Sequence, residues 1–127
     1  MTNRSVKIVE KPWGHEEIWA KTDNYVAKML YIKKGHRLSL QYHVKKEETI
    51  RVLSGEMVLH HRLELDDMYG AGPMSKSIMK EGDCFHVKPG THHRFEAENT
   101  DVVLLEVSTT EIDDVVRLQD DYNRGEK

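Results

Sequence analysis

The segment between Gly35 and Gly55 constrains the fold of this chain more than any other part of the sequence. Gln41 and His43 lie two residues apart in a run of alternating polarity, which predicts a β-strand with both side chains on one face. Glu48 follows a short charged break, so a second antiparallel strand can begin there and face the first. An amide oxygen, an imidazole and a carboxylate would then share one side of a hairpin. Such a trio lacks only one ligand of a four-coordinate metal site.

The two faces of the first predicted strand differ in polarity. One face carries polar side chains and would line a cavity: Arg37, Ser39, Gln41 and His43. The other face is mainly apolar: Leu38, Leu40, Tyr42 and Val44. The apolar face needs a cover, either a second sheet layer or another subunit. We therefore expect a homodimer formed over this sheet.

A second glycine-bounded segment supplies a candidate fourth ligand. His93 follows Gly82 and Gly90 near the start of a predicted strand, where its side chain could face inward. His92 competes with it, but adjacent strand residues point to opposite faces, so only one of the two should ligate. With the first three residues this makes a set of two nitrogens and two oxygens. Such a set suits Zn²⁺, Mn²⁺, Fe²⁺, Co²⁺ or Ni²⁺, and the sequence does not choose among them.

The rest of the chain is also predicted to be all-β. Roughly nine short β-prone stretches separated by glycine, proline and charged turns are typical of a sandwich or small barrel. The strand predicted over 24–33 is largely apolar on both faces and should be buried on both. Residues 66–75 predict a loop, and 112–122 predict a short helix or turn. We expect a single domain over residues 1–127, with its barrel core at about 24–110.

Composition narrows the classes of function. The net charge is −3 with no long run of one sign, which argues against a nucleic-acid partner. The longest strictly apolar run, residues 102–105, is far too short to cross a membrane, and no secretory signal is visible. The single Cys84 cannot form an internal disulfide. We therefore expect a cytoplasmic protein with no nucleic-acid or membrane partner.

Two further features have more than one interpretation. Lys28 lies in the middle of an apolar strand, where it is either a snorkelling edge lysine or a cavity lysine that binds an anion or acts as a base. The spacing of residues alone favours neither interpretation of Lys28. Cys84 and His86 share a strand face and could mimic a nucleophile–base pair. Because no third group is implied, we interpret them as packing residues.

The two glycine-bounded spacings resemble the two sequence motifs of the cupin superfamily. Gln41 stands where most cupins have a histidine, and Pro89 is displaced by one position from its usual place. The resemblance implies the cupin double-stranded β-helix, a small antiparallel barrel or jelly roll.

A closer resemblance, over roughly residues 8 to 124, is to the type II phosphomannose isomerase (mannose-6-phosphate isomerase) domain. It is carried by KPWG at 11–14, LSLQYH at 38–43, HRFE at 93–96, LEV at 105–107, DDVVRL at 113–118 and DYNR at 121–124. The roles it implies are metal ligation for Gln41, His43, Glu48 and His93, substrate contact for Lys28 and Ser39, and a part in activity for Arg117. We add Arg37, on the same predicted face as Ser39, as a substrate-binding candidate.

This chain departs from the family after its metal histidine. The family usually reads His-Arg-Ala-Glu-His-Trp there, whereas residues 44–50 read Val-Lys-Lys-Glu-Glu-Thr-Ile. Glu48 is kept, but the histidine and tryptophan beside it are absent. The change lies near the expected mouth of the cavity, so it concerns the substrate more than the fold or the metal.

The resemblance implies a metal-dependent aldose–ketose isomerase of a sugar phosphate. A metal would polarise the sugar oxygens, Lys28 or Glu47 would act as the base, and Arg117 with Lys28 would hold the phosphate. One alternative is a non-catalytic metal-bearing cupin that binds a sugar or sugar nucleotide. An iron-dependent cupin oxygenase is a further alternative, which Gln41 disfavours because such enzymes prefer a richer set of imidazoles.

Overall fold

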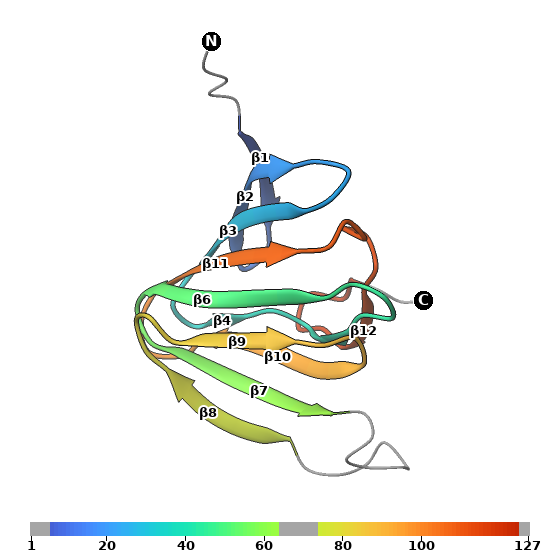
Figure 1. Cartoon of the computed structure of the whole chain (residues 1–127). Helices are drawn as coiled ribbons and strands as arrows, with labels where there is room; N and C mark the ends of the chain where they lie inside the picture. Colours follow the sequence, from blue (N-terminus) through green and yellow to red (C-terminus); the bar gives the residue numbers. More distant parts are fainter. Residues whose placement is uncertain (1–5, 64–73, 125–127) are drawn as a thin grey trace.

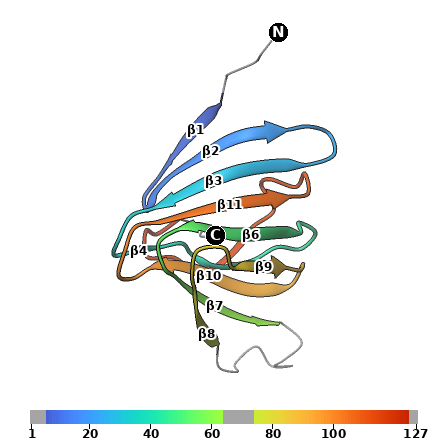
Figure 2. The same ribbon diagram turned by 60° about the vertical axis from the view of Figure 1, so that its left-hand side comes forward.

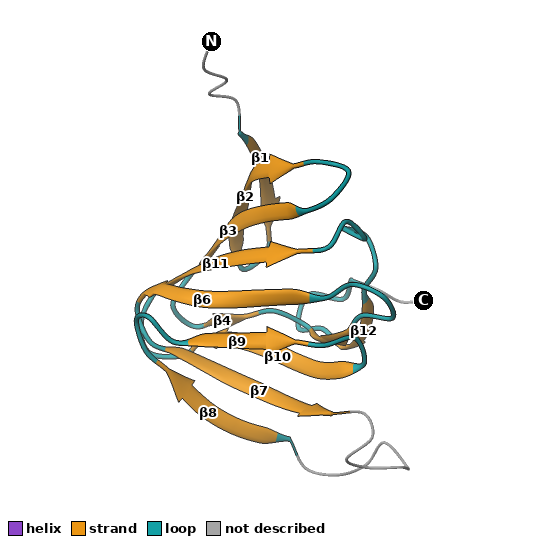
Figure 3. Cartoon of the chain, viewed as in Figure 1, coloured by secondary structure: helices purple, strands orange, loops and turns teal. Residues whose placement is uncertain are grey.

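The computed structural model describes residues 6–63 and 74–124, and within them the chain forms twelve β-strands and no helix (Figure 1, Figure 3). The predicted all-β class is confirmed. The described residues accordingly hold no helix with the length and apolar character needed to cross a membrane. The extent of a single domain over residues 1–127 stays a prediction.

The strands pair antiparallel in two sheets. In order across the first sheet these are β1 (Lys7–Lys11), β2 (Gly14–Lys21), β3 (Val26–Ile32), β11 (Val102–Ser108), β6 (Glu48–Ser54) and β9 (Cys84–Val87). The second sheet contains β12 (Val116–Gln119), β5 (Leu40–Tyr42), β10 (Thr91–Ala97), β7 (Met57–Leu63) and β8 (Ser75–Met79), while β4 (His36–Arg37) pairs with β10. In both ribbon views β1 and β2 lie at one end of the molecule and β8 at the other (Figure 1, Figure 2).

Alternate residues of each strand point into the space between the sheets, and these inward rows change character along the strand. In β3 the row contains Lys28, Leu30 and Ile32, all of them buried. In β11 it contains Leu104 and Glu106, also buried. The two strands are antiparallel, with Lys28 opposite Glu106, so the charged ends of both rows lie together.

The inward rows of two more strands change in the same way. In β6 the buried Glu48 precedes the buried Ile50 and Val52, and in β10 the buried His93 precedes the buried Phe95. The barrel therefore has an apolar core at one end and a group of buried polar side chains at the other. Burial of the apolar end supplies the free energy that offsets the cost of burying polar groups beside it.

The strand predicted to be buried on both faces is β3, and only its inward face is fully buried. On the outward face Met29 and Tyr31 are half-buried, and Tyr25, just before the strand, is exposed. Among the described residues no sheet packs over the outward row, which is the physical reason for the difference. The homodimer, which would cover apolar surface of this kind, stays a prediction.

The single strand predicted through residues 37–44 is divided in two. β4 ends at Arg37 and β5 begins at Leu40, with an irregular stretch between them. Leu38, expected to face away from the cavity, instead joins the core. The apolar face of the predicted strand was expected to need a cover. On that face Leu40 is buried within the chain, while Val44 is exposed. Because of this break, the alternation of side chains in β5 does not extend back to Arg37.

The C-terminal segment forms no helix. A turn at residues 112–113 leads into β12, which pairs with β5. Backbone pairing with the exposed edge of β5 therefore prevails over the helical spacing of the apolar residues in this segment. Because the opening segment is split and the tail adds a strand, the described chain has more strands than the nine or so expected. The loop predicted over 66–75 falls outside the described residues, apart from its last two positions.

The glycines that bound the first motif give a test of this fold. Gly35 and Gly55 both have positive φ, 85° and 86°, but a Cβ at Gly55 would lie 2.1 Å from the Asp101 carbonyl oxygen, whereas one at Gly35 meets nothing within 4 Å. Gly35→Ala should therefore lower the free energy of unfolding by only the backbone cost, about 1–2 kcal/mol. Gly55→Ala should cost clearly more in urea denaturation. Equal losses for the two variants would contradict the close contact at Gly55.

Candidate functional site

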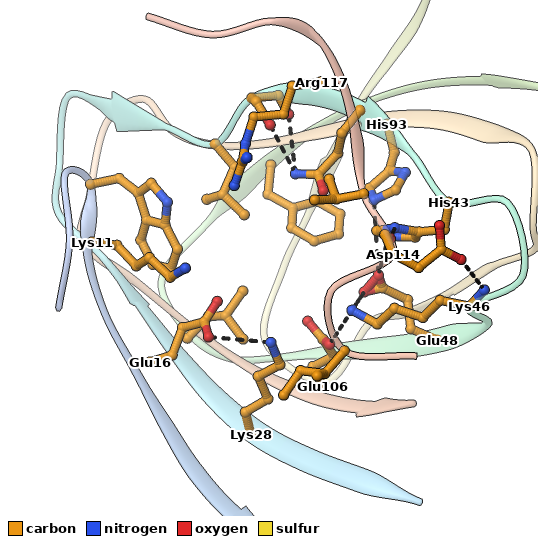
Figure 4. Close-up of a pocket in the computed structure, with 18 of the residues that line it drawn as sticks. Lys11, Glu16, Lys28, His43, Lys46, Glu48, His93, Glu106, Asp114 and Arg117 are labelled. Carbon is orange, nitrogen blue, oxygen red and sulfur yellow. Dashed lines mark hydrogen bonds and ion pairs between the residues drawn. The ribbon is translucent and has the colours of Figure 1, made fainter. Parts of the chain in front are cut away.

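The polar ends of the inward rows meet in a pocket of about 600 Å³, a volume that includes its opening to solvent (Figure 4). Strands of both sheets contribute to its wall. Seven of the eight side chains predicted as site residues line it: Lys28, Ser39, Gln41, His43, Glu48, His93 and Arg117.

Three of the predicted metal ligands converge on one side of this pocket. Glu48 Oε2 lies 3.1 Å from His43 Nε2 and 3.9 Å from His93 Nε2. One ligand atom from each residue lies within 4.8 Å of the others, and all three residues are buried. Two imidazole nitrogens and a carboxylate oxygen at these separations could hold a divalent cation.

The second ring nitrogen of each histidine is bonded to a backbone carbonyl. His43 Nδ1 donates to the Asp114 carbonyl at 2.6 Å, and His93 Nδ1 donates to the Thr91 carbonyl at 2.9 Å. Because a carbonyl can only accept, the proton of each neutral ring sits on Nδ1, and Nε2 carries a lone pair directed at Glu48. A nitrogen lone pair and a carboxylate oxygen 3.1 Å apart require a shared cation between them, either a proton or a metal ion.

The ionisation states also suit a metal. Burial lowers the pKa of His93 to about 4, so this ring is neutral near pH 7. Burial alone would raise the pKa of Glu48, but the neighbouring His43 and Lys46 outweigh it and lower the pKa to about 2. Metal ligands must be deprotonated, and these two groups meet that condition without a change of pH.

Asp114 holds the turn between His43 and Glu48. Nothing in the sequence indicated this role for Asp114. Its carboxylate accepts hydrogen bonds from the backbone N–H groups of Val44, Lys45 and Lys46 at 2.6–3.0 Å. Burial opposes ionisation of Asp114, but these three hydrogen bonds lower its pKa to about 2. Since its own carbonyl also binds His43, Asp114 positions the charged break between the two motif strands.

Gln41 lies beside the trio, directly opposite His93 where β5 pairs with β10. Its Nε2 donates to Ser39 Oγ at 3.2 Å and to the Ser39 carbonyl at 3.4 Å. Because the carbonyl can only accept, the amide nitrogen must face Ser39, and Oε1 is directed elsewhere. Ser39 therefore orients an amide oxygen that remains available as a ligand.

A row of buried charges of alternating sign continues from the ligands across the pocket (Figure 4). Lys46 Nζ lies 3.8 Å from Glu48 Oε1 and donates to Glu106 Oε2 at 3.1 Å. Lys28 Nζ donates to Glu16 Oε1 at 3.2 Å. Each buried charge thus has a neighbour of opposite sign, which reduces the cost of its burial. Burial, followed by the charge of Glu48, raises the pKa of Glu106 to about 7.

Three members of this row were not predicted as site residues. Glu16, Lys46 and Glu106 line the pocket. The available signal for Glu106 was its place two residues after Leu104 in the inward row of a strand. Lys46 lies in a turn, where no period indicates the direction of a side chain.

Cations occupy the side of the pocket away from the histidines (Figure 4). Lys11 and Arg117 make no hydrogen bond or salt bridge within the described residues, and Arg117 Nε is buried without a partner. Arg124 is paired with Asp120 and lies close enough to repel the charges of Lys11 and Arg117. Burial lowers the pKa of Lys11 although Glu16 opposes the shift, and burial followed by the charge of Arg124 lowers the pKa of Arg117. Such a group is suited to an anion.

Other candidate residues lie away from the pocket. Arg37 Nε donates to the Asp121 carboxylate at 2.6 Å and does not line the pocket, because the break between β4 and β5 turns it aside. Glu47, considered as a base, is exposed and bonded to His86. Cys84, expected to be a packing residue, is exposed together with His86 on β9, so neither packs in the core.

Solved structures with the same fold come from several proteins of low sequence identity. The capsular polysaccharide assembling protein CapF of Staphylococcus aureus matches 92% of this chain with 19% identity and a TM-score of 0.77, and this chain spans about a third (32%) of it. KdgF from Halomonas sp. matches 87% of this chain, and 91% of its own length is covered, with 17% identity and a TM-score of 0.68.

A sugar phosphate isomerase of the cupin superfamily, from Silicibacter pomeroyi, is also similar. The match covers 68% of this chain and 50% of the isomerase, with 23% identity and a TM-score of 0.54. These likenesses confirm the cupin fold. No curated protein matches the sequence. Residues 2–120 match the family described as "Mannose-6-phosphate isomerase C-terminal". Since that match covers nearly the whole chain, the chain belongs to the mannose-6-phosphate isomerase C-terminal family, whose cupin barrel it shares.

Proposed function

We propose that this chain is a metal-dependent aldose–ketose isomerase acting on a sugar phosphate such as mannose 6-phosphate. One observation carries the proposal: a single pocket has a His–Glu–His group on one side and the unpaired cations Lys11 and Arg117 on the other (Figure 4). A metal held there would bind the oxygens on the two carbons that change oxidation state, and the cations would bind a phosphate. The family name supports the same reaction class.

The pocket residues divide the work of such a reaction. A divalent metal held by His43, Glu48, His93 and the Gln41 amide oxygen would polarise the oxygens on C1 and C2 of the sugar. Lys28, paired with Glu16, is placed as a hydrogen-bond donor to a sugar oxygen. Lys11 and Arg117 bind the phosphate through charge-assisted hydrogen bonds and so fix the position of the sugar between the two sides.

Removal of a ligand should abolish both metal binding and turnover. In His43→Ala and His93→Ala we expect little bound metal by elemental analysis, and at least about a 100-fold loss in conversion of mannose 6-phosphate to fructose 6-phosphate with added Mn²⁺, Co²⁺ or Zn²⁺. Gln41→Ala should show a smaller loss of both. His86→Ala is the matched control, because His86 is exposed and outside the pocket, and it should behave as the unsubstituted protein.

The same experiment separates the competing functions. Retention of metal and full activity in both histidine variants would refute the site. Metal-dependent binding of the sugar phosphate with no turnover under any of the three metals would favour a non-catalytic sugar-binding cupin.

Lys11 and Arg117 should favour a phosphorylated sugar over the same sugar without a phosphate. In Arg117→Gln we expect KM for mannose 6-phosphate to rise by about tenfold or more, which corresponds to loss of a charge-assisted hydrogen bond. The weak affinity for unphosphorylated mannose, measured by calorimetry, should not change. Arg51→Gln on the outward side of β6 is the control, since Arg51 is exposed. An equal loss for both sugars would show that Arg117 does not contact the phosphate.

A further inference from the structure

We infer that Glu106 is the acid–base group that moves the proton between C1 and C2, with Lys46 as its positioning residue. This inference rests on the proposed isomerase function and adds the catalytic group that the metal and the cations do not supply. The isomerisation needs a group that removes a proton from one carbon and returns it to the next.

Glu106 occupies a central place in the pocket. It lies in the inward row of β11, opposite Lys28 on β3 and opposite Ile50 on β6. It is 3% exposed and lines the pocket between the metal-binding side and the Lys28–Glu16 pair (Figure 4). A sugar bound in the pocket between the histidines and Lys11 would have this carboxylate in its wall.

The other carboxylates of the pocket differ from Glu106 in their partners or in their place. Asp114 accepts three backbone hydrogen bonds, Glu16 is paired with Lys28, and Glu48 faces the two imidazoles. Glu106 accepts one hydrogen bond, through Oε2, and its Oε1 makes none within the described part of the chain. Glu16 Oε2 is likewise unbonded within the described residues, but Glu16 pairs with Lys28, whereas Glu106 is linked through Lys46 to Glu48. Glu106 is therefore the carboxylate beside the candidate metal ligands that has an oxygen left to accept a proton from substrate.

Neither base considered from the sequence meets this requirement. Lys28 Nζ donates to Glu16, so it is placed as a donor rather than as an acceptor of protons. Glu47 is exposed, bonded to His86, and absent from the pocket wall.

Lys46 determines how the Glu106 carboxylate is presented. Its Nζ lies 3.1 Å from Glu106 Oε2 and 3.8 Å from Glu48 Oε1, and the lysine is buried. The groups that face Glu106 are thus the ammonium groups of Lys46 and Lys28 and the carboxylate of Glu48. Because the Lys46 ammonium holds Oε2, the carboxylate cannot rotate freely, and Oε1 keeps its direction.

The proton and electron movements balance without a further reactant. Glu106 Oε1 takes the proton from C2 of the aldose, and the C–H electrons form the C1–C2 double bond while the carbonyl electrons move to O1. The O2 hydroxyl then gives its proton to O1. Electrons from O2 form the C2 carbonyl, and the double-bond electrons take the proton back from Glu106 at C1. The product is the ketose, and Glu106 is a carboxylate again.

The test is Glu106→Gln, which keeps the side-chain size and an oxygen that can accept from Lys46. We expect kcat to fall by about 10²–10⁴-fold. Exchange of the substrate C–H with D₂O, followed by NMR, should be lost in parallel. Metal content and the Kd for mannose 6-phosphate should stay within about threefold. Glu98→Gln, an exposed turn residue, is the matched control and should leave all four quantities unchanged.

Each outcome decides a separate point. If the unsubstituted protein isomerises the sugar phosphate and Glu106→Gln keeps more than a tenth of kcat or of exchange, the inference about Glu106 is overturned while the isomerase function stands. If the unsubstituted protein shows neither isomerisation nor exchange, the proposed function fails and takes the inference with it. Loss of metal or substrate binding in proportion to activity would show a structural role instead.

A second variant, Glu106→Asp, tests the inference if Glu106→Gln does not fold. Glu106→Asp keeps the carboxylate but withdraws it by one methylene. We expect at least a tenfold lower kcat, with KM and metal content within about threefold and with exchange reduced in the same ratio as turnover. Unchanged kcat in this variant would overturn the inference.

Discussion

Two backbone carbonyl groups determine what the polar end of this barrel can do. The Asp114 and Thr91 carbonyl oxygens each accept a hydrogen bond from a histidine Nδ1–H, so the Nε2 atoms of His43 and His93 present lone pairs to the same carboxylate, Glu48. Without these two bonds either ring could adopt the other tautomer or turn away. The geometry of the backbone thus gives two ordinary histidines the orientation that ligation of a metal requires.

The rest of the pocket is arranged so that these buried charges can be tolerated. Glu48, Lys46 and Glu106 alternate in sign, and Lys28 pairs with Glu16. Buried ion pairs rarely add net stability, because desolvation offsets the attraction. The apolar half of each inward row supplies the stability, and the polar half is better explained by chemistry than by folding. Lys11 and Arg117 fit the same interpretation, because a structural role would not require cations that have no partner in the part of the chain described.

Much of the fold and of the group of candidate ligands could be predicted because the evidence was local. Gln41, His43 and Glu48 are close in sequence, and the period of a strand is enough to place Gln41 and His43 on one face. The expected hairpin was wrong, because β5 and β6 lie in different sheets and do not pair, and Glu48 meets His43 across the space between the sheets. The prediction for Arg37 used the same rule but failed to put it in the pocket, since the regular strand is interrupted between β4 and β5. Periodicity holds only as far as the strand continues.

The remaining site residues depend on contacts between distant segments. Asp114 reaches the turn after His43 across some seventy residues of chain, and Lys46 meets Glu106 across sixty. The sequence by itself determined which residues of the regular strands face inward, because the direction of a side chain along a strand is a local property. Only the tertiary structure decided which inward charges become neighbours and which histidine nitrogen is left free. Those outcomes follow from the register of β3 and β6 against β11 and from the path of the C-terminal segment, and neither is encoded in any single stretch of the chain.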